Sequence, residues 1–110
     1  LAIPNILRSK MSANEAVART TLKTIAVACE NYATANNGIY PTAETDLTEG
    51  KLPYLNQSYD GQIVQSYKYT FNLTNTSYLI IASPENCGVG GSKIYTIITG
   101  SVLTEADCGT

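Results

Sequence analysis

Between Pro4 and Gly38 the chain contains neither glycine nor proline. Apolar side chains recur through this run at intervals of three, four or seven residues, which places them on one side of a helix. A strand, whose side chains alternate between two faces, cannot produce these intervals. At 100° per residue they fall within a sector of about 80°: Leu7, Met11, Ala18, Leu22, Ile25, Cys29 and Tyr32. We therefore predict one α-helix over residues 5–36, ended by Asn36-Asn37-Gly38.

This helix is too long for the body of its own domain. About 32 residues of helix span roughly 48 Å, whereas a globule of 110 residues has a radius of gyration near 13 Å. We expect the C-terminal half to pack on the domain through Leu22, Ile25, Cys29 and Tyr32, and the N-terminal half to protrude. The opposite side of the helix carries small, uncharged side chains: Ser9, Ala13, Ala16, Thr20, Val27 and Thr34.

The rest of the chain changes to the period of a β-sheet. Residues 38–66 mix proline, glycine and polar residues and are predicted to form a long loop with one helical turn near 44–49. Strands are predicted at 67–73, 78–83 and 93–99. Short connections favour an antiparallel sheet over 67–103, with a tail at 104–110. The predicted fold is α+β, a single domain over residues 1–110, in which helix 1–37 packs on three or four antiparallel strands.

Charge and composition exclude several classes of function. Residues 1–23 hold four basic residues and one acidic residue, a net charge of +3, whereas residues 24–110 hold three lysines and eight acidic residues, a net charge of −5. The chain has no histidine, and therefore lacks the commonest general base and metal ligand. We expect no enzymatic activity. A patch of Arg8, Lys10, Arg19 and Lys23 leaves nucleic-acid binding as an alternative that the overall charge disfavours.

The three cysteines allow one disulfide. Cys29 lies in the predicted buried stripe and is expected to be a reduced core residue. Cys87 and Cys108 both lie in segments near glycine, and we expect them to pair and tie the tail to the preceding loop. A lasting disulfide requires an oxidising compartment; three free thiols in a reducing one are the alternative.

The remaining motifs give only weak indications of a binding site. The stretch CGVGGSK at 87–93 lies between two predicted strands, so it lacks the following helix that a phosphate-binding loop needs. We expect no cofactor; Glu105 and Asp107 leave calcium as an alternative, although they supply few of the six to eight oxygens required. Tyr67, Tyr69 and Tyr95 are expected beneath the sheet. Three tyrosines of the loop are candidates for a subunit interface: Tyr40, Tyr54 and Tyr59.

Three stretches of the N-terminal part form a recognisable signature: Ala-Ile-Pro-Asn at 2–5, Asn-Glu-Ala at 14–16 and the segment from Tyr32 to Pro41. Through these stretches, residues 1–41 resemble type IV pilins and the pseudopilins of type II secretion. The strand segments 67–103 fit the same family more loosely. In these proteins the helix continues upstream into an apolar half that lies first in the inner membrane and later in a filament core. The resemblance implies that such a segment of about twenty residues is missing here and that Leu1 belongs to its last turn.

The resemblance implies a structural role without catalysis. The chain would be a subunit of a pilin-like filament, with a type IV pilus slightly favoured over a secretion pseudopilus. Its partners would be copies of itself and the inner-membrane assembly machinery. It would occupy the inner membrane and periplasm before assembly, and the cell surface or periplasm afterwards. The residues expected at the filament helix interface are Leu1, Ile3, Pro4, Leu7 and Met11. The alternative is a minor pilin that binds DNA or a surface ligand.

Overall fold

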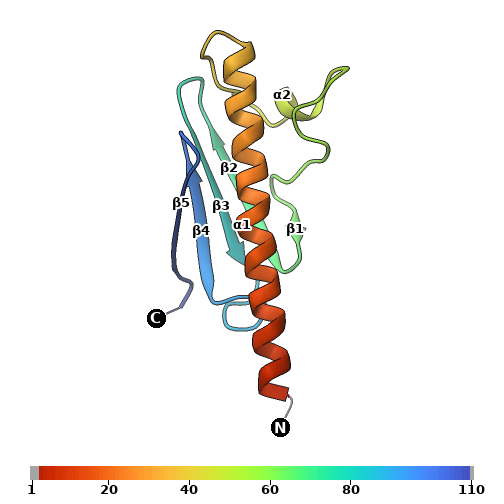
Figure 1. The fold of residues 1–110 in the computed structure, drawn as a ribbon, viewed down its shortest axis with the longest axis vertical. Helices are drawn as coiled ribbons and strands as arrows, with labels where there is room; N and C mark the ends of the chain where they lie inside the picture. The colour runs from red at the N-terminus through yellow and green to blue at the C-terminus, as the bar shows by residue number, and fades with distance from the viewer. Residues whose placement is uncertain (1–2, 110) are drawn as a thin grey trace.

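The computed structural model describes residues 3–109, in which one long helix lies across an antiparallel sheet (Figure 1). The helix α1 spans Ile3–Ala35 without interruption. It ends where Asn37 and Gly38 adopt positive φ angles of 58° and 83°, and the Gly38 N–H donates to the Ala33 carbonyl at 2.7 Å. Glycine tolerates this left-handed geometry at little cost, so the Asn-Asn-Gly sequence stops the helix as predicted.

Five strands follow α1, all antiparallel and in sequence order across the sheet. A short helix, α2 (Thr45–Thr48), lies in the connection from α1 to the sheet, at the position of the predicted helical turn. The strands are β1 (Ile63–Val64), β2 (Tyr67–Leu73), β3 (Tyr78–Pro84), β4 (Lys93–Ile98) and β5 (Val102–Asp107). The α+β class is therefore confirmed, with an antiparallel sheet that covers one side of one long helix.

The sheet is wider than the three or four strands predicted. The extra edge strand β1 consists of two residues within the predicted loop 38–66, joined to β2 by Gln65 and Ser66, whose φ angles are 49° and 70°. Such a turn favours glycine and asparagine, so these residues gave no hairpin signal. At the other edge, β5 continues into the predicted tail 104–110. Its residues are exposed on both faces from Thr104 onward, so the sequence lacks the alternation that marks a strand.

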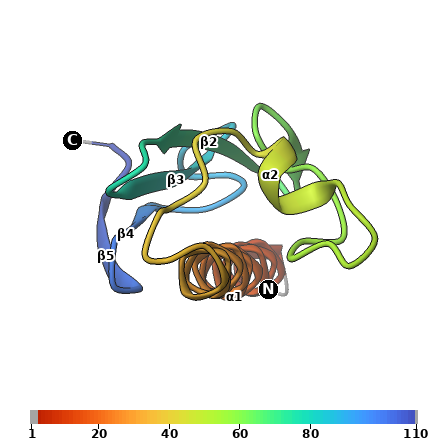
Figure 2. The same cartoon turned by 90° about the horizontal axis from the view of Figure 1, so that it is seen from above.

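The core lies between α1 and the concave face of the sheet (Figure 2). Leu22, Ile25 and Cys29 of α1 are fully buried, as the predicted stripe required, and Tyr32 packs at the edge of the core. Burying one leucine or isoleucine of this kind contributes about 1.5–3 kcal/mol. The sheet supplies four tyrosines that are almost fully buried, together with aliphatic side chains: Tyr67, Tyr69, Tyr78, Tyr95, Ile80 and Ile97. Leu47 of α2 and Leu55 close the side of the core beyond α1.

Candidate assembly surface on the long helix

The first turns of α1 extend beyond the sheet (Figure 1). Residues 6–10 are exposed, including Ile6 and Leu7, whose side chains are 51% and 43% accessible. Burial begins at Met11, and Ala18 is already fully buried. The molecule measures 55 × 28 × 18 Å, so its length is set by the helix. The protruding part is therefore shorter than the N-terminal half that the sequence predicted.

The loop between β3 and β4, residues 85–92, shortens the protrusion because it reaches α1. The Asn14 side-chain amide donates to the Gly90 carbonyl at 2.9 Å. The Glu15 carboxylate accepts hydrogen bonds from the Ser92 N–H at 2.8 Å and from the Ser92 hydroxyl at 2.9 Å. These polar contacts hold a part of α1 that the apolar stripe alone did not assign to the body. Asn14 and Glu15 were recognised in the sequence as part of a signature, but nothing in their spacing indicated this loop as their partner.

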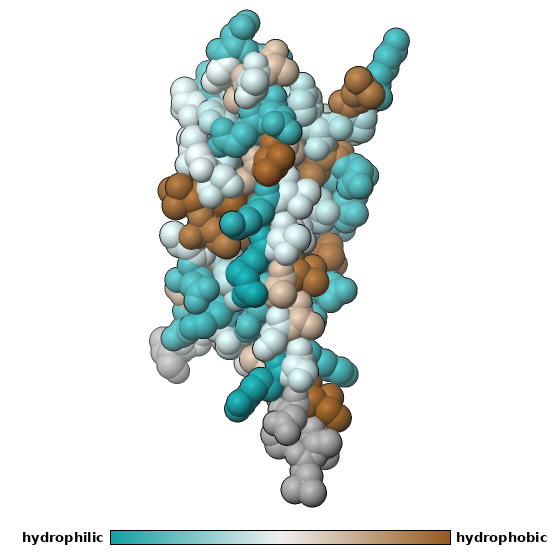
Figure 3. All heavy atoms as spheres, viewed as in Figure 1, coloured by the Kyte–Doolittle hydropathy of each residue, from teal (hydrophilic) through white to brown (hydrophobic). Residues whose placement is uncertain are grey.

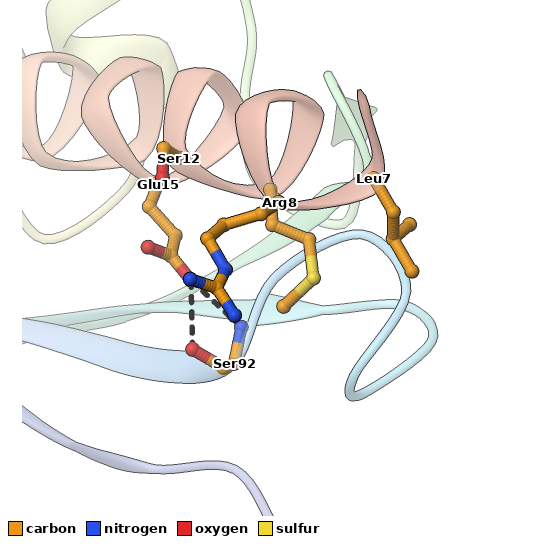
Figure 4. Close-up of a pocket in the computed structure, with 6 residues that line it drawn as sticks. Leu7, Arg8, Ser12, Glu15 and Ser92 are labelled. Atoms are coloured by element: carbon orange, nitrogen blue, oxygen red, sulfur yellow. Dashed lines mark hydrogen bonds between the residues drawn. The ribbon is translucent and has the colours of Figure 1, made fainter. Parts of the chain in front are cut away.

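A pocket of about 440 Å³ opens where α1 leaves the body (Figure 4). Leu7 and Met11 line its apolar side, and Arg8 extends toward Ser92 and the Glu15 carboxylate. Leu7 and Met11, predicted at the filament interface, therefore face the pocket beside the β3–β4 loop. Leu1 lies outside the described residues, as do the side chains of Ile3 and Pro4.

The opposite side of α1 is uncovered over most of its length. Figure 3 shows pale residues of intermediate hydropathy along it, with hydrophilic residues interspersed. All six small residues of this side that the sequence singled out are exposed: Ser9, Ala13, Ala16, Thr20, Val27 and Thr34. Val27 is 54% accessible. We call these six residues the free helix face.

Two shallow grooves run along this side of α1. One, of about 240 Å³, is lined by Ala16, Val17, Thr20 and Thr21. The other, of about 370 Å³, includes Thr20, Val27 and the ring of Tyr54. Tyr54 makes an edge contact with Tyr32, with ring centroids 5.6 Å apart, so a residue of the long connection forms a wall beside the helix. Of the three loop tyrosines predicted as interface candidates, Tyr54 is the one that lines a groove of α1.

Hydroxyl groups along this side bond to the helix itself. Thr24 donates to the Thr20 carbonyl and Thr34 to the Glu30 carbonyl, each at 3.0 Å. The hydroxyls of Thr24 and Thr34 therefore have partners within α1 and need none from a neighbouring molecule. The small side chains of the free helix face leave a surface at which a second helix can approach closely.

The basic residues of α1 are divided between two environments. Arg8, Lys10 and Lys23 are exposed, and Lys23 lines the groove beside Val27. The Arg19 guanidinium donates to the Tyr95 hydroxyl at 2.9 Å and stacks over that ring at 5.5 Å from its centroid. Arg19 is therefore engaged with the sheet, and the predicted four-residue basic patch retains three exposed members.

Glu30 joins the C-terminal part of α1 to three other elements. Its carboxylate accepts hydrogen bonds from the Tyr40 hydroxyl at 2.9 Å, from the Tyr78 hydroxyl at 2.7 Å and from the Gly100 N–H at 2.9 Å. Burial opposes ionisation, but the bonds from Tyr78, Gly100 and Tyr40 outweigh it, so the pKa of Glu30 lies below its usual value. No sequence pattern indicated this role.

The cysteines occupy the places that the sequence suggested. Cys87 and Cys108 form a disulfide that ties the residue after β5 to the β3–β4 loop. Cys29 is reduced and buried, and burial, with the nearby Glu30 charge, raises the pKa of its thiol to about 12. A thiol with this pKa stays protonated at neutral pH and is a poor nucleophile.

The carboxylates of β5 lie on its exposed surface. Asp107 is paired with the Lys93 ammonium group at 2.6 Å, and this hydrogen bond lowers the pKa of Asp107. Within residues 3–109 there is no group of three or more acidic or cysteine side chains arranged to hold a metal ion. In the same part of the chain, none of the helices combines the length and the hydropathy needed to cross a membrane.

The sequence thus located the free helix face, but it did not locate the grooves, the β3–β4 contact or the Glu30 contacts. These depend on side chains far apart in the chain.

Comparisons with models of protein families, with curated proteins and with solved structures find no match to this chain.

Proposed function

We propose that this chain is a structural subunit of a type IV pilin-like filament, either a type IV pilus or a type II secretion pseudopilus. The observation that carries the proposal is the uninterrupted helix α1, with projecting turns and a free helix face of small, uncharged residues. The resemblance of residues 1–41 to pilins supports the same reading. The type IV pilus is slightly favoured because a disulfide ties down the C-terminal segment.

Assembly in this proposal is a packing reaction. The helix of one subunit packs with the helices of its neighbours, and small side chains permit the close approach that a tight bundle needs. A head-to-tail contact between identical subunits that does not close on itself produces a filament. The remainder of the molecule, residues 39–109, which we call the head, would surround this bundle. Localisation at the inner membrane before assembly, and at the surface or in the periplasm afterwards, is part of the proposal.

Electron microscopy of the full-length protein, expressed with a pilin assembly system, tests this function. We expect filaments that contain the chain. A chain that accumulates stably in the membrane and never enters filaments would refute the proposal. Filaments that persist outside the cell would favour a pilus, and loss of protein export on deletion would favour a pseudopilus.

A matched pair of variants tests the helix face itself. Ala16→Arg places a long charged side chain in the groove of α1, and we expect it to abolish filaments while the chain still folds, because Ala16 is exposed. Asn56→Arg adds the same charge at an exposed position of the long connection and should leave filaments intact. Equal assembly by both variants would show that the free helix face is not the contact.

A further inference from the structure

The β3–β4 loop, residues 85–92, reaches the first half of α1 (Figure 1). It offers the Gly90 carbonyl to the side-chain amide of Asn14. It also offers the N–H and the hydroxyl of Ser92 to the carboxylate of Glu15. Two consecutive residues of the helix therefore have their hydrogen-bond partners in this one loop, which we call the strap.

The same stretch of α1 has little support from apolar packing. Each of residues 11–17 is exposed or half-buried, and the first fully buried residue of the helix is Ala18. The pocket of about 440 Å³ lies between this part of α1 and Ser92 of the strap (Figure 4). The position of residues 11–17 against the head therefore depends on the hydrogen bonds to the strap.

A disulfide in turn holds the strap. Cys87, within the strap, is bonded to Cys108 after β5. The Cys108 N–H donates to the Ser92 carbonyl at 3.0 Å, so the residue that binds Glu15 is also tied to the disulfide. Three of the six residues 87–92 are glycines, which have the most backbone freedom to regain when such a tie is opened.

We propose that the strap is a redox-sensitive device that sets how much of α1 is free. With the disulfide closed, the free part is residues 3–10, about 12 Å of helix. With the disulfide open, the strap loosens and the free part extends over residues 3–17, about 22 Å. A helix of about 15 residues without tertiary contacts is marginally stable in water, so the released turns would fray.

The opening reaction is thiol–disulfide exchange with a dithiol reductant. Cys87 is exposed, so a thiolate of the reductant can attack its Sγ; the disulfide bond breaks and the Cys108 Sγ leaves as a thiolate, which takes up a proton. The second thiol of the reductant then displaces Cys87 from the mixed disulfide. Two electrons pass to the chain, which gains two thiols, and the reductant becomes a cyclic disulfide. Cys29 is already reduced and takes no part.

The consequence for assembly rests on the proposed function. An oxidised chain would present α1 as a rod fixed to the head from Asn14 onward, and a reduced chain would present a rod whose first turns are frayed. Exchange measurements on the chain alone detect the strap whether or not the chain forms filaments, so the two proposals can fail separately.

Amide hydrogen exchange of the chain, with and without excess dithiothreitol, tests the strap. We expect reduction to speed exchange at least about tenfold in residues 11–17 and in the strap, and no more than about twofold in residues 22–32 of α1. Faster exchange in the strap alone would overturn the proposal, because the helix would then be held without it. A uniform rise over α1 and the sheet would also overturn it, because reduction would then weaken the whole fold.

Three variants separate the strap from general destabilisation. The double variant Cys87→Ser, Cys108→Ser should show the reduced pattern with no further effect of dithiothreitol. Glu15→Ala, with the disulfide closed, should speed exchange in residues 11–17 while the strap stays protected. Ile80→Val weakens the core and leaves the strap intact, so it should not speed residues 11–17 more than residues 22–32. A selective rise in residues 11–17 of Ile80→Val, or no rise there in the double variant, would overturn the proposal.

Discussion

Replacing Glu30 tests how the long helix is fixed to the head. The carboxylate accepts three hydrogen bonds from three separate segments, at 2.7–2.9 Å. In Glu30→Ala the Tyr78 hydroxyl, on a residue only 2% accessible, loses the acceptor for its proton. It would still accept a hydrogen bond from the Ser101 N–H at 2.9 Å.

The structure gives the expected magnitude. A hydrogen bond to a charged group contributes about 1.5–3 kcal/mol, and a buried donor left without a partner costs about 1–3 kcal/mol. Glu30 is only partly buried, so water replaces some of what is lost. We expect Glu30→Ala to lower the free energy of unfolding by about 2–3 kcal/mol, and Glu30→Gln, which keeps one acceptor oxygen, by about 1 kcal/mol.

The pH dependence gives an independent measurement. In the folded state the pKa of Glu30 lies below its ordinary value, because the hydrogen bonds that its carboxylate accepts outweigh the effect of burial. The contribution of its charge is therefore present above the unfolded-state pKa and disappears as the pH falls through the folded-state pKa. Urea unfolding at about pH 7 and about pH 2.5 should show that wild type is more stable than Glu30→Gln at the higher pH and that this advantage is smaller at the lower pH.

Glu49→Gln is the control, because Glu49 is exposed and its removal should change stability by no more than about 0.5 kcal/mol. The reasoning fails if Glu30→Gln unfolds at the same urea concentration as Glu49→Gln at both pH values. It also fails if the difference between wild type and Glu30→Gln is the same at both.

Two glycine substitutions and reduction of the disulfide test how the β3–β4 loop is held. A Cβ on Gly91 would overlap the Tyr67 hydroxyl, which bonds to the Lys93 carbonyl at 2.7 Å, so Gly91→Ala should cost at least about 2 kcal/mol in urea unfolding. Gly88→Ala, at an exposed positive-φ position with free space, should cost about 1 kcal/mol, and an equal cost for both would contradict the overlap. Reducing the disulfide, which links cysteines 21 residues apart, should cost about 3 kcal/mol and speed amide exchange of the loop. Unchanged exchange after reduction would show that hydrogen bonds alone hold the loop.

The extent to which the sequence could predict this structure follows from the range of the interactions involved. The helix α1 and the strands β2, β3 and β4 were predictable, because their apolar pattern is local and strong. The strands β1 and β5 were not, because β1 depends on a turn of Gln65 and Ser66 with positive φ, and β5 has polar residues on both faces. Backbone hydrogen bonds to β2 and β4 hold these two edge strands in the sheet. Such bonds do not depend on the type of side chain, so the sequence does not indicate them.

The candidate site divides in the same way. The free helix face could be recognised because small residues repeat on one side of α1. The partners of Glu15 and Glu30 lie 77 and 48–70 residues away, except for Tyr40, and no periodicity links a carboxylate to a distant hydroxyl or N–H. The length of the protruding part of α1 was overestimated for this reason. The polar residues Asn14 and Glu15 were predicted to lie on a free part of the helix, whereas the β3–β4 loop supplies hydrogen-bond partners for both.

The two polar contacts have a mechanical consequence for the proposed filament. Glu15 and Glu30 fix α1 to the head at two points separated by 15 residues, or about 22 Å along the helix. The fully buried residues Leu22, Ile25 and Cys29 lie between these points. A rod held at two points and packed between them cannot swing relative to the sheet without breaking bonds at one end. The orientation of the head is therefore set by the orientation of the helix. If α1 packs among its copies through the free helix face, the sheet, which lies on the other side of α1, is carried outward.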